Sequence, residues 1–193
     1  MRLPLKYPNV DLSEAITYIN DLEFVKVKTK YAADGWSALS LQGFGYKPSD
    51  ILKPNVLGSK TDLDHVVETK MYQHPIFEPI RKIVDVIPSN KERVRLMKLS
   101  ASTTIAPHTD KVDKDFVKRK IVRIHIPITD NEDLVEYIVW KDGEKFKDPL
   151  GFSKYYYLDV RQKHSVVNKD IKDRINIVAD VFVNDKISQM IGF

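Results

Sequence analysis

The sequence contains no cysteine. This absence excludes a disulfide framework, a thiolate zinc site, an iron–sulfur cluster and a cysteine nucleophile. Any metal ion bound by the chain must therefore be held by histidine, aspartate or glutamate side chains. Since there are only five histidines, each can be considered individually.

Long hydrophobic runs are also lacking. No stretch approaches the roughly 18 apolar residues that a membrane-spanning helix needs. The N-terminal residues lack the apolar segment of a secretory signal. We therefore expect a cytoplasmic protein that has no membrane partner.

Charge of one sign is not concentrated anywhere in the chain. The 31 basic and 27 acidic residues give a net charge of +4, but the two kinds are interleaved. This distribution is a weak case for nucleic-acid binding, and we expect no nucleic-acid partner. At 193 residues, 42% of them hydrophobic, the chain can bury a core, and we expect one domain over residues 1–193. The sequence leaves the oligomeric state open.

The first 92 residues mix helical and extended patterns. Apolar residues at helical spacing follow Ser13, which we expect to cap the first helix. A polar, proline-containing loop at 46–60 is long enough to act as a lid over a site. The expected elements are helices at 13–21 and 74–88 and strands at 24–29 and 36–44.

From residue 93 onward the chain alternates short strand-like runs with polar turns. The pattern predicts a mainly β fold, a double-stranded β-helix (jelly roll, cupin-like) over 93–183, with the N-terminal helices packed on one outer face. We expect the lysine-rich segment 111–120 to be a solvated turn and residues 184–193 to form a C-terminal tail. The predicted strands are 93–99, 105–110, 119–129, 135–141, 155–160, 165–167 and 174–183.

Two of these strands carry polar residues on one face only. Side chains alternate across a strand, so Arg123 and His125 share a face opposite Ile124. The last strand repeats the arrangement with Arg174 and Asn176. A solvated outer face explains such a pattern on one strand, but its repetition favours a ligand cavity between the sheets.

A metal site is indicated by His108 and Asp110. Two residues apart on an extended segment, their side chains point the same way, but this spacing is common by chance and a third ligand is required. His164 is the candidate. If the following turn is centred on Lys169, a hairpin places His164 opposite Arg174. Two histidines and one carboxylate leave coordination positions open, as in non-haem Fe(II) oxygenases, and Arg174 can bind a carboxylate bidentately.

These residues also carry a resemblance to a known family. The chain from about residue 93 to 183, about half of its 193 residues, resembles the aspartyl/asparaginyl β-hydroxylase family of Fe(II)- and 2-oxoglutarate-dependent oxygenases. The matching segments are Pro107-His108-Thr109-Asp110, Arg123-Ile124-His125, His164-Ser165-Val166, and Arg174 with the following Ile177-Val178-Ala179-Asp180-Val181.

The resemblance implies roles for individual residues. It places iron at His108 and His164 and the distal carboxylate of 2-oxoglutarate on Arg174. Arg123 and His125 are implied as additional contacts to this cosubstrate. The best-known animal members have a glycine in place of Asp110, whereas this chain has the complete triad of His108, Asp110 and His164.

The activity implied by the resemblance is hydroxylation of an unactivated C–H bond of an amino acid, either free or within a peptide or protein. Aspartate, asparagine and proline are the expected substrate types. The reaction would use O₂, release succinate and CO₂, and be stimulated by ascorbate. Trp36 and Gln42 are expected substrate contacts.

Two other functions fit parts of the pattern. Nucleic-acid dealkylating oxygenases share the metal triad and an Arg-x-Asn segment like Arg174-Ile175-Asn176, but Asp180 stands where their second arginine is expected. A non-catalytic, cupin-like module that holds Zn²⁺ or Ni²⁺ is the other alternative. Failure to consume 2-oxoglutarate with iron bound would favour the module.

Overall fold

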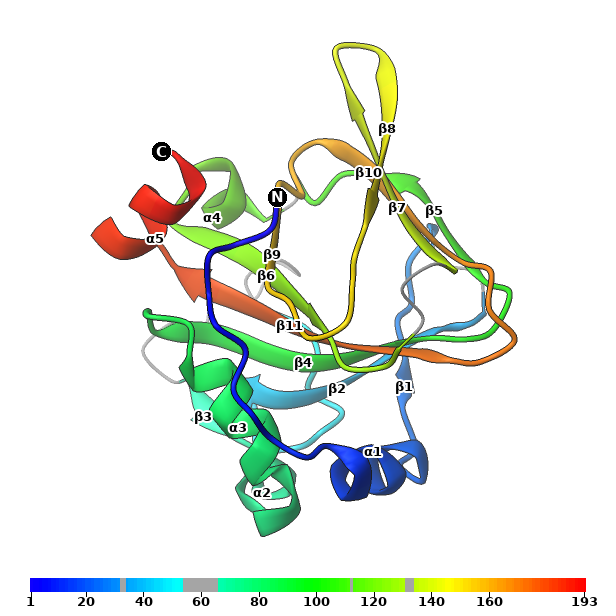
Figure 1. Cartoon of the computed structure of the whole chain (residues 1–193), viewed down its shortest axis with the longest axis vertical. Coiled ribbons are helices and arrows are strands. Elements are labelled where there is room, and N and C mark those ends of the chain that lie inside the picture. Colours follow the sequence, from blue (N-terminus) through cyan, green and yellow to red (C-terminus); the bar gives the residue numbers. More distant parts are fainter. Residues whose placement is uncertain (32–33, 54–65, 112, 131–133) are drawn as a thin grey trace.

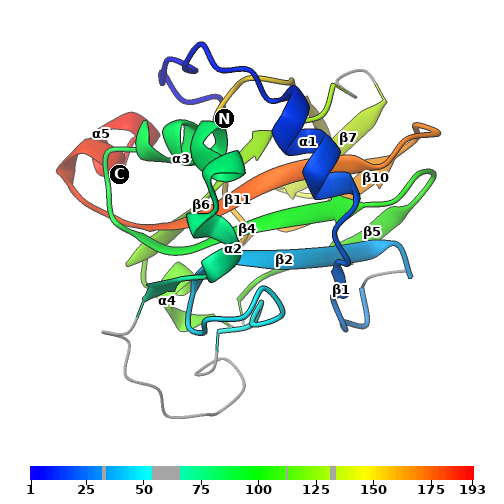
Figure 2. The same ribbon diagram turned by 90° about the horizontal axis from the view of Figure 1, so that it is seen from below.

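Two antiparallel sheets face each other and form a double-stranded β-helix, as predicted from the sequence (Figure 1). The computed structural model describes residues 1–31, 34–53, 66–111, 113–130 and 134–193. The larger sheet carries the helices on its outer face, and the smaller sheet covers part of its inner face (Figures 1 and 2). The space between the sheets is where a ligand cavity was expected.

The larger sheet has its longest strands at its centre. Its order is β1-β2-β4-β11-β6-β9, and the short β3 pairs with β2. The central β11 is paired with β4 on one side and with β6 on the other, so its backbone forms hydrogen bonds along both edges. The strands are β1 (Val25–Lys26), β2 (Trp36–Gly43), β3 (Val67–Glu68), β4 (Lys91–Leu99), β6 (Ile121–Pro127), β9 (Tyr156–Leu158) and β11 (Arg174–Phe182).

The smaller sheet contains four strands in the order β5-β10-β7-β8. These are β5 (Thr104–His108), β7 (Val135–Lys141), β8 (Glu144–Pro149) and β10 (Lys163–Asn168). Strand β8 was not predicted from the sequence. This strand lies at the edge of the sheet and exposes Glu144, Lys145 and Lys147, so it lacks the apolar alternation by which strands are found.

The N-terminal helices cover the outer face of the larger sheet, as expected, and the C-terminal helix joins them (Figure 2). The short helix at 114–117 lies on the opposite side, where its Phe116 belongs to a separate buried cluster. Ile80 and Ile83 of one helix share a buried cluster with Ile124 and Ile177 of the sheet. No helix among the described residues is long and apolar enough to cross a bilayer. The helices are α1 (Ser13–Asn20), α2 (Lys70–Gln73), the 3-10 turn η2 (Pro75–Phe77), α3 (Glu78–Asp85), α4 (Lys114–Val117) and α5 (Asp185–Ile191).

Three local expectations were wrong. Ser13 does not cap α1: Leu12 occupies that position, and Asp11 Oδ1 accepts the Ser13 backbone N–H at 2.9 Å. The segment 111–120 contains α4, whose Phe116 is buried. The C-terminal residues form α5, which packs on the core rather than extending as a tail.

The proposed lid loop at 46–60 is described only in part. Residues 46–53 are described, and Ile51 and Lys53 are buried there. Residues 54–60 lie outside the described residues, so the lid stays a prediction.

The two faces of β6 and β11 have different surroundings. Ile124 and Ile177 point to the helix-covered core. Arg123, His125 and Arg174 point to the opposite side, where they line a cavity together with residues of the smaller sheet. The alternation read from the sequence therefore separates a packing face from a polar interior.

The expected hairpin between His164 and Arg174 does not form. His164 lies in the smaller sheet, where it pairs with His108 and Val139, whereas Arg174 lies in the larger sheet opposite Leu99. The connection crosses between the sheets instead. Its start is fixed by Asn168, whose side-chain amide donates hydrogen bonds to three backbone carbonyl oxygens: those of Leu99, Ser100 and Lys172.

Replacing Ile83 by alanine tests whether the helix layer is part of the stabilising core. Ile83 lies on α3, and its side chain is fully buried against the larger sheet. We expect Ile83→Ala to lower the free energy of unfolding by about 2–5 kcal/mol, because the change leaves a cavity. Urea denaturation followed by circular dichroism measures it.

The control is Ile171→Ala, since Ile171 is 88% exposed. We expect this variant to stay within about 0.5 kcal/mol of the parent protein. Equal effects of the two changes would contradict a core between helices and sheet.

Candidate metal centre

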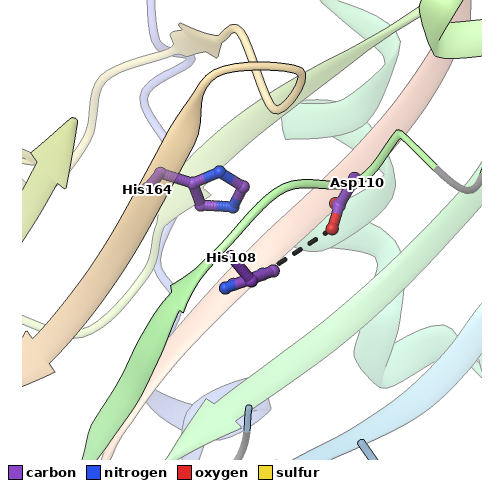
Figure 3. A group of neighbouring side chains, drawn as sticks. All are labelled: His108, Asp110 and His164. Carbon is purple, nitrogen blue, oxygen red and sulfur yellow. Dashed lines mark ion pairs between the residues drawn. The ribbon is translucent and has the colours of Figure 1, made fainter. Parts of the chain in front are cut away.

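Strand pairing brings the two predicted histidine ligands together. His108 ends β5 and is the register partner of His164 in β10, and the two ring centroids lie 4.3 Å apart. Asp110 lies two residues beyond the end of β5, and its backbone N–H donates to the Val160 carbonyl oxygen at 2.8 Å. One ligand atom from each side chain of the triad lies within 4.8 Å of the other two. Figure 3 shows both rings and the carboxylate turned toward a shared space.

Backbone hydrogen bonds determine which ring nitrogen of each histidine faces this space. His108 Nδ1 lies 2.9 Å from the Ala106 carbonyl oxygen, and His164 Nδ1 lies 2.9 Å from that of Gln162. Because a carbonyl oxygen can only accept, each Nδ1 carries the proton and each Nε2 keeps a free lone pair. Burial also lowers the pKa of His164, which keeps that ring neutral as metal binding requires.

The carboxylate of Asp110 is oriented by Arg123. Arg123 Nη1 donates to Asp110 Oδ2, and Asp110 Oδ1 lies 3.6 Å from His108 Nε2. Arg123 is itself held by Asp180, with Nε to Oδ1 at 2.7 Å and Nη2 to Oδ2 at 3.1 Å. The guanidinium predicted to contact a cosubstrate thus lies between two carboxylates. A hydrogen-bond donor to a metal-binding carboxylate orients that carboxylate and tunes its affinity for the metal.

Asp180 is fully buried and is shared by three arginines. Besides Arg123, its carboxylate pairs with Arg93 at 2.7 Å and Arg95 at 3.0 Å. Burial alone would raise the pKa of Asp180, but the three guanidinium groups hold it far below its usual range. No role was predicted for Arg93 or Arg95, although both lie on the same face of β4.

An inner cavity of about 90 Å³ lies between the sheets beside the triad. Residues of the larger sheet that line it include Ala38, Met97, His125, Arg174, Asn176 and Val178, and both histidines of the triad border it. This volume is well below the roughly 300–1,000 Å³ of drug-sized sites, so the cavity suits a small molecule.

Asn176 connects two of the three predicted cosubstrate residues, Arg174 and His125. Its Oδ1 accepts from Arg174 Nη2 at 3.2 Å, and its Nδ2 lies 2.8 Å from His125 Nδ1. Since the amide nitrogen can only donate, His125 accepts at Nδ1 and carries its proton on Nε2. Burial lowers the pKa of His125 well below its usual value, so the ring is a neutral donor. The strand alternation placed Asn176 on the cavity face beside Arg174, but no role was predicted for it.

Arg174 is 6% exposed, and within the described part of the chain it forms no ion pair with a carboxylate. Burial lowers the pKa of Arg174 to about 10, which leaves it charged near neutral pH. A buried, charged guanidinium without an acidic partner is costly unless an anion joins it.

An outer cavity of about 220 Å³ adjoins His108 and Asp110 of the triad. The Tyr31 ring stacks on His108 with centroids 4.9 Å apart. The outer cavity shares six lining residues with the inner cavity: Trp36, Leu52, Arg95, His108, Asp110 and Arg123. The other side chains that line it are Thr29, Tyr31, Lys53, Arg93, Thr109, Asp113 and Phe116.

The two predicted substrate residues are placed differently. Trp36 borders both cavities, and its ring centroid lies 6.3 Å from that of His108. The Gln42 amide donates to the Lys91 carbonyl oxygen at 2.7 Å, and Gln42 borders neither cavity. Trp36 therefore lies next to the triad, whereas Gln42 takes part in the packing of β2 on β4.

Comparisons with known proteins show the fold. No family model matches the chain, and no curated protein matches it. It is similar to the solved structure of an oxidoreductase of the 2OG-Fe(II) oxygenase family from Burkholderia pseudomallei, with 10% identity over 89% of this chain and 77% of that one and a TM-score of 0.50.

Weaker similarities are found to two other kinds of solved structure. The non-heme alpha ketoglutarate dependent epimerase SnoN from nogalamycin biosynthesis is 14% identical over 91% of this chain and 75% of that one, with a TM-score of 0.48. A cupin domain from Bordetella pertussis is 10% identical over 47% of this chain and 81% of that one, with a TM-score of 0.34.

Metal binding tests the triad directly. We expect the protein to bind one Co²⁺, used as a spectroscopic substitute for Fe(II). His164→Ala should weaken this binding by about 100-fold or more, because it removes a ligand, and loss of a residue that only orients a ligand already costs about 10–100-fold. Visible absorption of the bound Co²⁺ measures the affinity. His74→Ala, which changes an exposed histidine at the start of η2, should bind Co²⁺ like the parent. Equal loss in both variants would contradict the site.

Proposed function

We propose that the chain is an Fe(II)- and 2-oxoglutarate-dependent dioxygenase that hydroxylates an unactivated C–H bond of an amino acid, either free or within a peptide. The observation that carries this proposal is Arg174, a buried guanidinium that has no carboxylate partner among the described residues and borders the same small cavity as His108 and His164. The fold shared with a 2OG-Fe(II) oxygenase family protein supports it.

The residues of the triad fit Fe(II). Two neutral imidazoles and one carboxylate are the donor set of non-haem Fe(II) oxygenases, and three ligands leave further positions for a chelating cosubstrate and O₂. The free Nε2 atoms of His108 and His164 and the oriented Asp110 carboxylate are what such an ion requires. Bound Fe(II) and 2-oxoglutarate would together supply the oxidation of a C–H bond by O₂, with release of succinate and CO₂.

The inner cavity offers complementary groups for a dicarboxylate. Arg174 would receive the distal carboxylate bidentately. The Nε2–H of neutral His125 would donate a hydrogen bond to the end of the cosubstrate near the metal. Met97 and Val178 line the cavity between these polar groups and exclude water from the carbon chain. Fixed donors in a small, dry cavity orient the cosubstrate before the reaction begins.

The outer cavity supports the choice of substrate class. Its volume of about 220 Å³ is below the roughly 300–1,000 Å³ of drug-sized sites and suits one amino-acid residue. Trp36 borders this cavity beside His108, so its ring would contact the substrate. A buried arginine that borders the metal ligands is unnecessary in a purely structural cupin-like module.

An anaerobic titration with Fe(II) and 2-oxoglutarate tests the proposed function. We expect a visible charge-transfer band that saturates with 2-oxoglutarate, and Arg174→Ala should raise the Kd of 2-oxoglutarate by about 30-fold or more, since removing one partner of a buried charge pair costs at least about 2 kcal/mol.

The matched control is Arg2→Ala, which removes an exposed arginine that borders neither cavity. It should leave the titration unchanged. Absence of the band in the parent protein, with iron shown to be bound, would contradict the proposal and favour the metal-binding module.

Asn176→Ala tests the connection between Arg174 and His125. Loss of two hydrogen bonds of about 1 kcal/mol each should raise the Kd of 2-oxoglutarate by roughly 10-fold or more, because both cosubstrate contacts lose their orientation. The same titration measures it, while the Kd of Co²⁺ should stay that of the parent. Asn20→Ala, at the exposed end of α1, is the control, and a parallel loss of Co²⁺ binding in Asn176→Ala would indicate a structural role instead.

A further inference from the structure

Strand β8 has a strand partner along only one of its two edges in the described part of the chain. It is the last strand of the smaller sheet, and its register partners all lie in β7. The hairpin that β7 and β8 form projects beyond the rest of the molecule (Figure 1). An open strand edge is a template for pairing with another chain, so the groups along this edge determine what it can bind.

The turn between the two strands determines which backbone groups of β8 face the open edge. A two-residue turn connects Lys141 to its register partner Glu144, and both turn residues have positive φ, 52° and 84°. This is typical of a type I′ hairpin, in which the closing pair is hydrogen-bonded and bonded pairs alternate. The backbone N–H and C=O groups of Lys145 and Lys147 therefore point to the open edge. The same count places the nitrogen of Pro149, which carries no hydrogen, at this edge, where no bond to β7 is lost.

Phe146 is an apolar side chain on this edge strand, and it is 46% exposed. It lies on the opposite face of the sheet from Lys145 and Lys147, because side chains alternate along a strand. Its face is the one that carries Val139 and His164, its neighbours across the sheet. Proteins usually place charges rather than large apolar side chains on an open edge. A strand added to β8 would cover the exposed ring.

Four lysines gather on the other face of the smaller sheet. Lys145 and Lys147 come from β8, Lys163 from β10, and Lys169 directly follows β10. Among the described residues, Glu136 is the carboxylate that pairs with members of this group, and Lys147 and Lys169 both contact its Oε1 at 2.7 Å. Four ammonium groups and one carboxylate leave an excess of positive charge, which favours an acidic partner.

Trp140 holds two of these lysines beside its ring. The Nζ atom of Lys163 lies 5.1 Å from the ring centroid, and that of Lys145 lies 5.9 Å from it. Both distances are within the range of a cation–π interaction. Because two ammonium groups already contact this ring, it is a poor platform for the base stacking by which proteins bind single-stranded nucleic acid. The cluster therefore favours carboxylates of a protein over a nucleic acid.

Charge also disfavours a second copy of this chain as the partner. Two β8 strands that paired antiparallel around a two-fold axis would place lysines opposite lysines on one face of the joined sheet. Like charges directly opposite each other are destabilising. An acidic strand has no such conflict with Lys145 and Lys147.

We propose that the open edge of β8 binds an extended, acidic segment of a partner protein, which adds to the smaller sheet as a further strand. The segment alternates acidic residues, which lie beside Lys145 and Lys147, with apolar residues, which cover Phe146. Backbone hydrogen bonds supply affinity in this binding mode, and the alternating side chains supply specificity. This inference does not depend on the function proposed above, because the edge needs neither a metal ion nor a cosubstrate to bind.

The experiment measures the binding of fluorescently labelled probes to the protein by anisotropy. The first probe is a peptide that alternates glutamate and valine. A second replaces its glutamates by lysine, a third replaces its valines by serine, and a single-stranded oligothymidylate is the fourth. Hydrogen exchange of the Lys145 and Lys147 amides, followed by NMR, reports whether the peptide adds as a strand.

We expect saturable binding of the glutamate–valine peptide and slower exchange of both amides. The serine peptide and the Phe146→Ala variant should each bind about 10-fold more weakly, because the apolar contact is lost. Reversal of charge in Lys145→Glu/Lys147→Glu should also weaken binding by about 10-fold or more, and the lysine peptide should not bind the parent. The control Lys186→Glu, which changes an exposed lysine of α5, should bind as the parent does.

A pair of variants at Lys147 tests the backbone contact separately. Both Lys147→Pro and Lys147→Ala remove the charge, but only the proline also removes the N–H at the open edge. Lys147→Pro should therefore bind the peptide about 5-fold more weakly than Lys147→Ala, as expected for the loss of one hydrogen bond. Circular dichroism checks that both variants keep the fold of the parent.

Four results would overturn the inference: no saturable binding of the glutamate–valine peptide, equal binding of the lysine peptide, unchanged exchange of the Lys145 and Lys147 amides, or tighter binding of the oligothymidylate than of the peptide. Sedimentation of the protein alone supplies a further test. A dimer that forms with rising concentration and is lost in Phe146→Ala would assign the edge to a second copy and would also overturn the inference.

Discussion

One buried carboxylate, Asp180, underlies the organisation of the site. It lies on the central strand β11 and brings Arg93, Arg95 and Arg123 together on the inner face of the larger sheet. A single negative charge cannot compensate three guanidinium groups, so each arginine needs a further anion. Arg123 finds it in Asp110, and through this pair the core of the sheet orients the carboxylate of the candidate metal triad. Breaking such a buried network is costly, whereas its complete form holds the site in one geometry.

Much of the architecture was predictable because the strand pattern is strong. The alternation of Arg123 and His125 with Ile124 separates an interior face from a packing face, and the structure has this arrangement. The pairing of strands was not predictable from local pattern. The sequence after Asn168 is typical of a hairpin turn. In the structure, the side-chain amide of Asn168 donates to the Leu99 and Ser100 carbonyl oxygens, and the chain crosses to the larger sheet.

The site was predictable to the extent that its residues lie in recognisable spacings. His108, Asp110 and His164 come together as that spacing suggests. The roles of Arg93 and Arg95 depend on contacts with Asp180, which is 85 residues from Arg95 in the chain, and no local pattern reveals such contacts. Polar residues on a strand also look alike in sequence. Gln42 resembles a site residue, but the structure uses it to bind a neighbouring backbone carbonyl.

The larger buried cluster lies outside the sandwich, between the helices and the outer face of the larger sheet. Stability and ligand chemistry are therefore carried largely by opposite faces of the same strands. Side chains at the cavity walls, such as Trp36 and Leu52, are exchangeable without opening the helix-covered core. A scaffold of this kind can acquire new substrates by mutation while it retains its folding, since the residues that change specificity are not the ones on which the fold depends most.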